Sequence, residues 1–198
     1  MIQIYGSHMS SAGRCLWLLE ELGVPYERLQ VDLRDPAARK KYVDEVFNGG
    51  KVPFLLDGDV RLFESMAINT YLAAKYKPEL LPSDPYGRAL VDQWSFWAIS
   101  NLSAEALKVL YHSHLLPEDQ RDPKQVESGK AGCARYLAQL EDSLTGEWLV
   151  GKSFTLADLN VASVVNLAAR TGLSMGPRVT AWLKRNTERA AFKKVFGG

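Results

Sequence analysis

The segment Lys51–Gly58 contains backbone that could hold a ligand. Val52–Leu56 is apolar enough for a short strand, and Pro53 has no N–H to give to a sheet, so we expect the backbone at Val52 to be unpaired. A cis bond before Pro53 would be a specific device at this place. Ser65 is a good N-cap residue and predicts a helix N-terminus. An unpaired extended backbone beside a helix N-terminus predicts a site for a small anionic peptide.

A second segment with chemical capacity is the turn Gly6-Ser-His-Met-Ser-Ser-Ala-Gly13, between the first expected strand and the first expected helix. It carries three hydroxyls, one imidazole and a flexible glycine at each end. Free backbone N–H groups and the helix dipole favour negative charge at such a place. The turn therefore predicts stabilisation of an anion, with its serine hydroxyls as candidate donors.

The composition excludes several classes of function. Lys and Arg number 24 against 23 Asp and Glu, and this near-neutral balance argues against nucleic-acid or membrane-surface partners attracted by charge. The first residues lack the apolar core of a signal peptide, and no apolar run approaches the length of a bilayer span. Cys15 and Cys133 are far apart, which favours a reducing compartment without a disulfide framework. We therefore expect a cytoplasmic protein with no nucleic-acid and no membrane partner.

Strand and helix patterns alternate in the N-terminal part of the chain. The expected elements are, in order, a strand over Ile2–Tyr5, a helix over Ala12–Leu22 closed by Gly23, a strand over Tyr26–Leu33, a helix over Pro36–Val46, a hairpin of Val52–Leu56 and Val60–Phe63 around Asp57-Gly58, and a helix over Met66–Tyr76 capped by Ser65. A parallel βαβ unit followed by an antiparallel hairpin and a helix is the thioredoxin-like βαβαββα arrangement.

The rest of the chain shows helical periodicity only. The expected helices are Arg88–His114, Lys124–Leu144, Thr155–Thr171, Pro177–Asn186 and Glu188–Val195. The proline-rich residues 78–87 are predicted to form a linker. The predicted fold class is α/β followed by all-α, with a thioredoxin-like domain over 1–77 and an all-helical domain over 88–198.

These features together resemble the cytosolic glutathione transferases, in which the same Val-Pro and Glu-Ser elements recur in a small α/β domain joined to a helical one. Gly151-Lys-Ser-Phe-Thr-Leu-Ala-Asp158 is similar to the family's G-x-x-x-T-x-A-D start of a buried helix. Thr155 and Asp158 have the spacing of a capping box in this segment. Arg189-Ala-Ala-Phe192 is similar to the family's terminal R-P-A-F segment, with Ala190 in place of the proline. The resemblance spans nearly the whole chain.

The resemblance implies a serine-type transferase, similar to the theta and phi classes, that presents glutathione as a thiolate to a small electrophile. An ordinary thiol has a pKa of about 8.5, and lowering it by about two units takes roughly 2.7 kcal/mol, which one or two donors aimed at the anion could supply. Ser10 precedes Arg14 in the Ser-x-x-x-Arg pattern of serine-type relatives, so we expect its hydroxyl to donate to the thiolate. Ser11 is the competing donor, because one sequence does not fix a one-residue register. A cysteine-type enzyme using Cys15 is a weaker alternative.

The resemblance also implies which residues hold glutathione. They are Lys51, Val52, Pro53, Glu64, Ser65, Arg39 and Lys40. The backbone at Val52 would pair with the cysteinyl unit, and Glu64 and Ser65 would hold the γ-glutamyl end. Lys51 would pair with the glycyl carboxylate as a point charge. The two other basic residues are included because relatives often carry a cation in that segment.

The acceptor pocket is expected between the two domains, where apolar ligand sites are often found. Its predicted lining is His8, Met9, Asn101, Lys108 and Tyr111. The resemblance implies glutathione as co-substrate. No cluster in the sequence has the spacing of a metal site, so we expect no metal. A homodimer is expected from the family.

Two other functions fit the same resemblance. A non-catalytic glutathione-binding or scaffold protein would keep the fold without the chemistry, since fold does not fix function. A glutathione-dependent peroxidase or reductase would use the same thiolate on a different acceptor.

Overall fold

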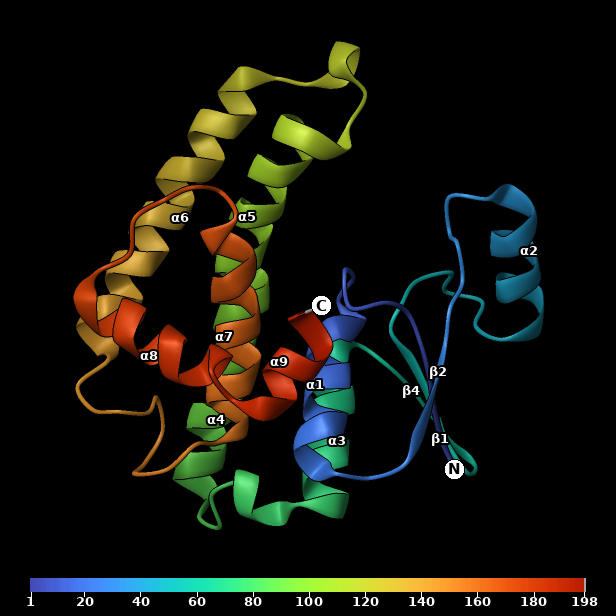
Figure 1. Ribbon diagram of the computed structural model, residues 1–198, viewed down its shortest axis with the longest axis horizontal. Coiled ribbons are helices and arrows are strands. Elements are labelled where there is room, and N and C mark those ends of the chain that lie inside the picture. Colours follow the sequence, from blue (N-terminus) through green and yellow to red (C-terminus); the bar gives the residue numbers. More distant parts are fainter. Residues whose placement is uncertain (198) are drawn as a thin grey trace. The chain divides into compact units, whose positions relative to one another are not determined.

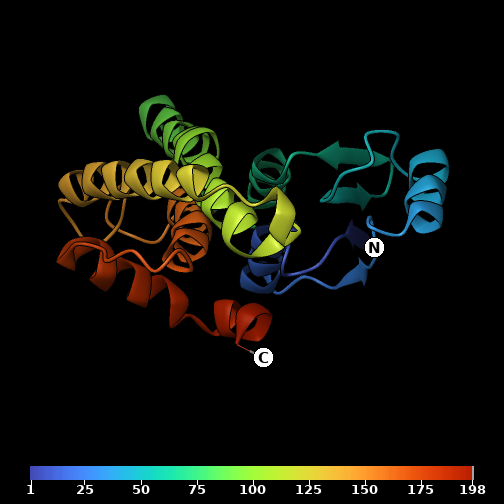
Figure 2. The same cartoon turned by 90° about the horizontal axis from the view of Figure 1, so that it is seen from above.

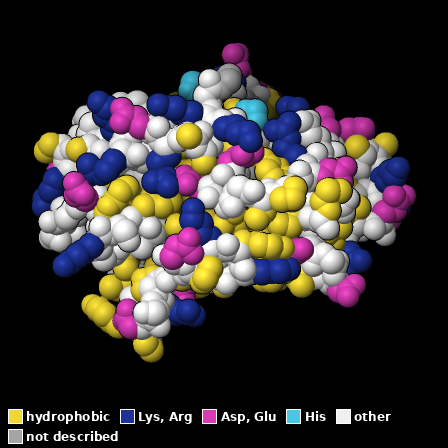
Figure 3. All heavy atoms as spheres, turned by 60° about the horizontal axis from the view of Figure 1, so that its bottom comes forward, with side chains coloured by type: hydrophobic (Ala, Val, Ile, Leu, Met, Phe, Trp, Pro, Cys, Tyr) yellow, Lys and Arg dark blue, Asp and Glu magenta, His cyan; other side chains and the backbone are white. Residues whose placement is uncertain are grey.

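The structure is a computed structural model that describes residues 1–197 (Figure 1). It divides into two compact units, Met1–Pro78 with the C-terminal segment from Ala190, and Glu79–Arg189. On the face displayed in Figure 3, acidic and basic side chains are interspersed, in keeping with the near-neutral composition.

The first unit is built on a four-stranded mixed sheet. Its elements are β1 (Ile2–Tyr5), α1 (Ala12–Leu22), β2 (Tyr26–Leu29), α2 (Pro36–Glu45), β3 (Phe54–Asp57), β4 (Val60–Phe63), α3 (Ser65–Tyr76) and, at the C-terminal end, α9 (Ala190–Phe196). The strand order is β2-β1-β3-β4, with β2 parallel and β3 antiparallel to β1. Figures 1 and 2 show α1 and α3 on one side of the sheet and α2 on the other. The thioredoxin-like βαβαββα prediction is confirmed.

Alternating burial explains why the sheet forms where it does. Ile2 and Ile4 of β1 are buried while the residues between and after them are partly exposed, as expected for a strand with one face on a core. Leu16 of α1 and Leu72 of α3 are fully or almost fully buried. Gly23 ends α1 in the left-handed conformation, with φ 64°, as the sequence predicted.

Two strand ends and the hairpin loop differ from the sequence prediction. The second strand ends at Leu29 and not at Leu33, because the Asp32 carboxylate accepts the backbone N–H of Arg34 at 3.0 Å and forms a local turn. The third strand begins at Phe54, after the proline. The hairpin loop is Gly58-Asp59, since Asp57 pairs with Val60.

The N-cap of α3 was also predicted wrongly. Glu64 occupies the cap position, and Ser65 is the first helical residue. The reason is that the Ser65 hydroxyl accepts a hydrogen bond from Arg14 Nη1 at 2.9 Å. Its oxygen is therefore engaged with another helix.

The second unit is all-helical. Its elements are η1 (Pro78–Leu80, at the junction), α4 (Pro85–Trp97), η2 (Ala98–Leu102), α5 (Ser103–Leu110), η3 (Tyr111–Leu115), η4 (Glu118–Gln120), α6 (Pro123–Ser143), α7 (Leu156–Ala169) and α8 (Pro177–Thr187). The segments η2 and η3 are π turns that widen the predicted helix Arg88–His114. That helix begins earlier than predicted, at Pro85, because the Asp84 side chain caps it by accepting the Gly87 N–H at 2.8 Å.

Helix α7 forms the buried centre of this unit, and Asp158 organises its start. The Asp158 carboxylate accepts the backbone N–H of Leu149 and Thr155, each at 2.9 Å, and the indole N–H of Trp182 at 2.8 Å. Burial raises the pKa of Asp158, and these hydrogen bonds oppose the shift. The predicted capping box is present. These residues serve the fold, as the sequence indicated.

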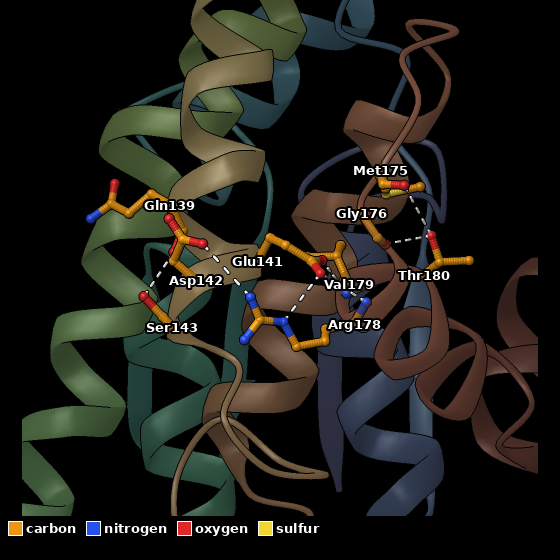
Figure 4. Close-up of polar contacts among 9 residues, drawn as sticks. All are labelled: Gln139, Glu141, Asp142, Ser143, Met175, Gly176, Arg178, Val179 and Thr180. Atoms are coloured by element: carbon orange, nitrogen blue, oxygen red, sulfur yellow. Dashed lines mark hydrogen bonds and ion pairs between the residues drawn. The ribbon is translucent and has the colours of Figure 1, made fainter.

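Helix α8 is capped by a side chain from another helix. Figure 4 shows Glu141 of α6 facing the first turn of α8, where it accepts the backbone N–H of Arg178 at 3.0 Å and of Val179 at 2.8 Å. A Cβ on Gly176, the cap residue of α8, would lie 2.3 Å from the Glu141 carboxyl carbon. Glycine at this position therefore permits the approach of Glu141.

Two further findings concern the whole chain. The last helix, α9, groups with the first unit, which differs from the predicted division at 88–198. Among residues 1–197, no helix combines the length and apolar character needed to cross a membrane.

Candidate functional site

Gly6 lies between the turn after β1 and the segment before β3, and its lack of a side chain lets the two segments pack closely. Gly6 has φ 131°, a backbone conformation that residues with a side chain rarely adopt. A Cβ on Gly6 would lie 3.3 Å from both Ser10 Oγ and Val52 Cβ, and 2.6 Å from Ala12 Cβ. Ser10 and Val52, which lie far apart in sequence, are therefore both packed against Gly6.

The two candidate serines have different environments. Ser10 is half-buried; its hydroxyl donates to the Ser7 carbonyl at 2.8 Å and accepts the backbone N–H of Ala12 at 3.2 Å. Ser11 is exposed, occupies the N-cap position of α1 and makes no side-chain capping bond. Both are next to the first turn of α1, so a hydroxyl and the helix dipole act at the same place.

The segment before β3 has the geometry that the sequence suggested. The Val52–Pro53 peptide bond is cis. The first ladder pair of this strand is Phe54 with Tyr5, so Val52 lies outside the sheet. The Tyr42 hydroxyl donates to the Lys51 carbonyl at 2.9 Å and ties the segment to α2. The Val52 backbone is thus held in place without a strand partner.

The start of α3 carries a second group of polar features. Glu64 has φ 66°, the only positive φ of a non-glycine residue among residues 1–197, and its side chain is exposed. Such a conformation costs on the order of 1–3 kcal/mol and is often found at functional sites. Beside it, the Arg14 guanidinium donates to Ser65 Oγ. Arg14 is only 8% exposed; burial lowers its pKa, and the adjacent Cys15 and Glu64 oppose that shift.

Arg14 is the site residue to which sequence reasoning gave no role of its own. Its signal was the Ser-x-x-x-Arg spacing, but its partner Ser65 lies 51 residues away, and only the fold brings the two together. The adjacent Cys15 is fully buried, and its thiol donates to the Ser65 carbonyl at 3.5 Å. Burial raises the pKa of Cys15 to about 12, against the opposing effect of Arg14. A thiol of this kind is a poor nucleophile near neutral pH.

The three basic side chains predicted to bind glutathione have different surroundings. Lys51 is exposed beside the cis-proline segment. A Cβ on Gly50 would lie 3.9 Å from Arg39 Nε, so the Arg39 guanidinium lies next to that same segment. Lys40 forms an ion pair with Asp44 on the exposed surface of α2. The structure therefore brings Arg39, but not Lys40, to the vicinity of Lys51.

The predicted acceptor residues fall in the two different units. His8 and Met9 are exposed in the turn of the first unit. In the second unit, Asn101 lies in the π turn η2, Lys108 pairs with Glu105 at 2.7 Å, and Tyr111 is 47% exposed. Their common role in a pocket stays a prediction. Residues 1–197 contain no group of three or more His, Cys, Asp or Glu side chains that could hold a metal ion.

A thioredoxin-like unit with a cis-proline packed near the β1–α1 turn, followed by a helical unit, defines the class of the glutathione transferases. The comparisons with known proteins agree with it. The glutathione S-transferase N-terminal domain family matches residues 2–74, and the corresponding C-terminal domain family matches residues 102–190. The chain belongs to the glutathione S-transferase family.

Several relatives align over nearly their full length. The chain is 31% identical to the glutathione S-transferase GstB of Escherichia coli (strain K12), covering 98% of this chain and 97% of the relative. It is 33% identical to glutathione S-transferase 1 of Zea mays, covering 98% and 95%. The theta class glutathione S-transferase of Xanthomonas axonopodis pv. citri, solved with glutathione bound, is 30% identical with a TM-score of 0.85, covering 98% and 96%.

Proposed function

We propose that this protein is a serine-type glutathione transferase that holds glutathione along the Val52 backbone and stabilises its thiolate through Ser10. The observation that carries the proposal is the packing of Ser10 Oγ and Val52 against Gly6. A peptide paired with the Val52 backbone would present its cysteinyl sulfur to the Ser10 hydroxyl. The solved relative with glutathione bound supports glutathione as the peptide.

The hydrogen bonds of Ser10 suit a donor to an anion. The Ala12 N–H donates to Ser10 Oγ, which holds the oxygen in place and polarises its proton. A thiolate is a stronger acceptor than the Ser7 carbonyl that now receives this proton. Rotation of the hydroxyl alone would transfer the bond to sulfur. A hydrogen bond to a charged group contributes about 1.5–3 kcal/mol, enough for a thiol pKa shift of about one to two units.

The remaining parts of glutathione have candidate partners in the same unit. The Ser65 oxygen accepts from Arg14, so its own proton is available to the γ-glutamyl carboxylate. The N-terminus of α3 and the buried positive charge of Arg14 favour a negative group at this place. Lys51 and Arg39 are the proposed partners of the glycyl carboxylate. Lys40, already paired with Asp44, has weaker support.

The chemical step needs no further catalytic group from this unit. A thiolate attacks the electrophilic carbon, the carbon–sulfur bond forms, and the leaving group departs with the electron pair. Most of the rate gain would come from lowering the thiol pKa and from holding the two reactants together. We propose that the acceptor binds beside the turn that carries His8 and Met9, and that the working form is a cytoplasmic homodimer.

Ser10→Ala and Ser11→Ala form a matched pair that tests the donor. Loss of Ser10 returns the bound thiol toward its ordinary pKa, so turnover of an activated aryl halide at pH 7 falls about 25-fold for a two-unit shift, while KM for glutathione changes little. Ser11→Ala keeps turnover within about twofold. Equal activity of Ser10→Ala and wild type would overturn the assignment, and a loss confined to Ser11→Ala would transfer the role to that residue.

A further inference from the structure

The C-terminal helix packs on the helix that begins at the catalytic turn. Figures 1 and 2 show α9 alongside α1. Phe192 meets Trp17 edge to face, with ring centroids 5.0 Å apart, and Phe196 packs on Phe192 at 4.7 Å. Lys194 Nζ also lies 2.6 Å from a Glu20 carboxylate oxygen. These contacts fix α9 to α1 along its length.

The last aromatic ring of α9 reaches the turn itself. A Cβ on Gly13 would lie 2.5 Å from the His8 carbonyl oxygen and 3.0 Å from Cε1 of Phe196. The Phe196 ring and the backbone of His8 therefore occupy the space around Gly13. The Gly13 N–H donates to the Ser10 carbonyl at 2.9 Å. Phe196 therefore contacts Gly13, and Gly13 is hydrogen-bonded to Ser10.

We propose that Phe196 is a positioning residue for the Ser10 hydroxyl, an inference that rests on the function proposed above. Glycine has wide backbone freedom, and Gly13 has no side chain to limit it. The Phe196 ring supplies that limit from outside the turn. Since a hydrogen bond weakens steeply with poor distance or angle, movement of the turn would weaken the Ser10–thiolate bond more than it weakens binding at Val52 or Ser65.

The test uses the full chain and measures the pKa of bound glutathione from its ultraviolet thiolate absorbance, together with kcat and KM. Phe196→Ala is expected to raise the bound thiol pKa by about 0.7 unit, so that thiolate and kcat at pH 6.5 fall about threefold and recover at high pH. KM for glutathione should stay within about twofold. Phe196→Leu, which keeps part of the apolar volume, should give a smaller shift in the same direction.

Lys194→Ala is the matched control, because it removes a different attachment of α9 to α1, the ion pair with Glu20, without touching Gly13. It should leave the thiol pKa unchanged. Unchanged thiol pKa in both Phe196 variants, with Ser10→Ala shifted, would overturn the positioning role and leave the proposed function intact. An unshifted Ser10→Ala would instead overturn the proposed function, and the role of Phe196 with it.

Discussion

Arg14 connects two segments of the proposed glutathione site. It lies in the first turn of α1, four residues after the proposed thiolate donor Ser10, yet its guanidinium donates to Ser65 at the start of α3. We predict that Arg14→Gln raises KM for glutathione about tenfold, because a charge-assisted hydrogen bond and a buried positive charge are both lost. Steady-state kinetics with glutathione as the varied substrate would measure this.

Arg28→Gln is the control for that change, since Arg28 is exposed on β2 and the substitution is the same. It should leave KM unchanged. An unaltered KM in folded Arg14→Gln would mean that Arg14 supports only the packing of α1 on α3.

Arg39 and Lys40 allow a second comparison between single residues. Arg39 lies beside Gly50, whereas Lys40 is paired with Asp44. We predict that Arg39→Ala raises KM for glutathione about threefold, as expected for an exposed ion pair, and that Lys40→Ala does not. The effect of Arg39→Ala should disappear with a glycyl ester of glutathione, and its persistence there would exclude the glycyl carboxylate as the partner.

The sequence supplied the candidate residues of the proposed site, but it did not supply their contacts. The turn of Gly6–Gly13 was recognisable by its composition, and the Val-Pro and Glu-Ser elements by their resemblance to the transferase family. Ser65 was assigned as a cap because serine commonly caps helices. The fold gives its hydroxyl to Arg14 instead, a long-range contact that local propensity does not contain.

At the scale of elements, glycine decides how the β1–α1 turn is built. Gly6→Ala would place a methyl group 2.6 Å from Ala12 Cβ at φ 131°, and we predict a loss of stability of about 2 kcal/mol together with most of the activity. Gly23→Ala also has positive φ but meets no atom within 4 Å. It should cost about 1 kcal/mol and leave activity unchanged. Urea unfolding and turnover measured on both variants would test this, and full activity in folded Gly6→Ala would contradict it.

The cap of α8 predicts a pH-dependent stability. Although partial burial opposes it, hydrogen bonds from Val179 and Arg178 lower the pKa of Glu141. A lowered folded-state pKa means that the carboxylate stabilises the fold above its unfolded pKa of about 4.3, and that this contribution is lost as the pH falls through the folded value. We predict that Glu141→Gln costs about 1 kcal/mol at pH 7 and much less near pH 3.

Asp142→Asn is the natural control for Glu141→Gln. Asp142 is 86% exposed and lies 3.7 Å from Arg178, so its loss should not measurably change stability at either pH. Urea unfolding at the two pH values supplies the comparison. A constant effect of Glu141→Gln across this range would contradict the capping account.

The sequence predicted the types of the secondary-structure elements better than the residues at which they begin and end. The βαβαββα order was readable because periodicity and turn residues agree along the first half of the chain. The second strand was predicted to continue to Leu33 because Val31 and Leu33 are apolar and alternate with polar residues. In the structure, the turn formed by Asp32 and Arg34 ends the extended segment earlier. The π turns within 98–115 carry no sequence signal of their own.

At the scale of the whole molecule, every residue proposed to hold glutathione belongs to the first unit, and so does the C-terminal helix. The sequence placed that helix with the others because its periodicity is helical, and periodicity does not say which partner it packs on. Its packing on α1 places Phe196 of α9 beside Gly13, next to the turn proposed to activate glutathione. The proposed activation of glutathione is therefore a property of this unit.

The most direct test of that activation is a pH titration of glutathione bound to the wild-type protein and to Ser10→Ala, followed by the ultraviolet absorbance of the thiolate. We predict a bound thiol pKa of about 6.5 in the wild type and a return toward about 8.5 in the variant. Glutathione that binds to the wild type but ionises no earlier than in water, or an identical early ionisation in Ser10→Ala, would contradict it.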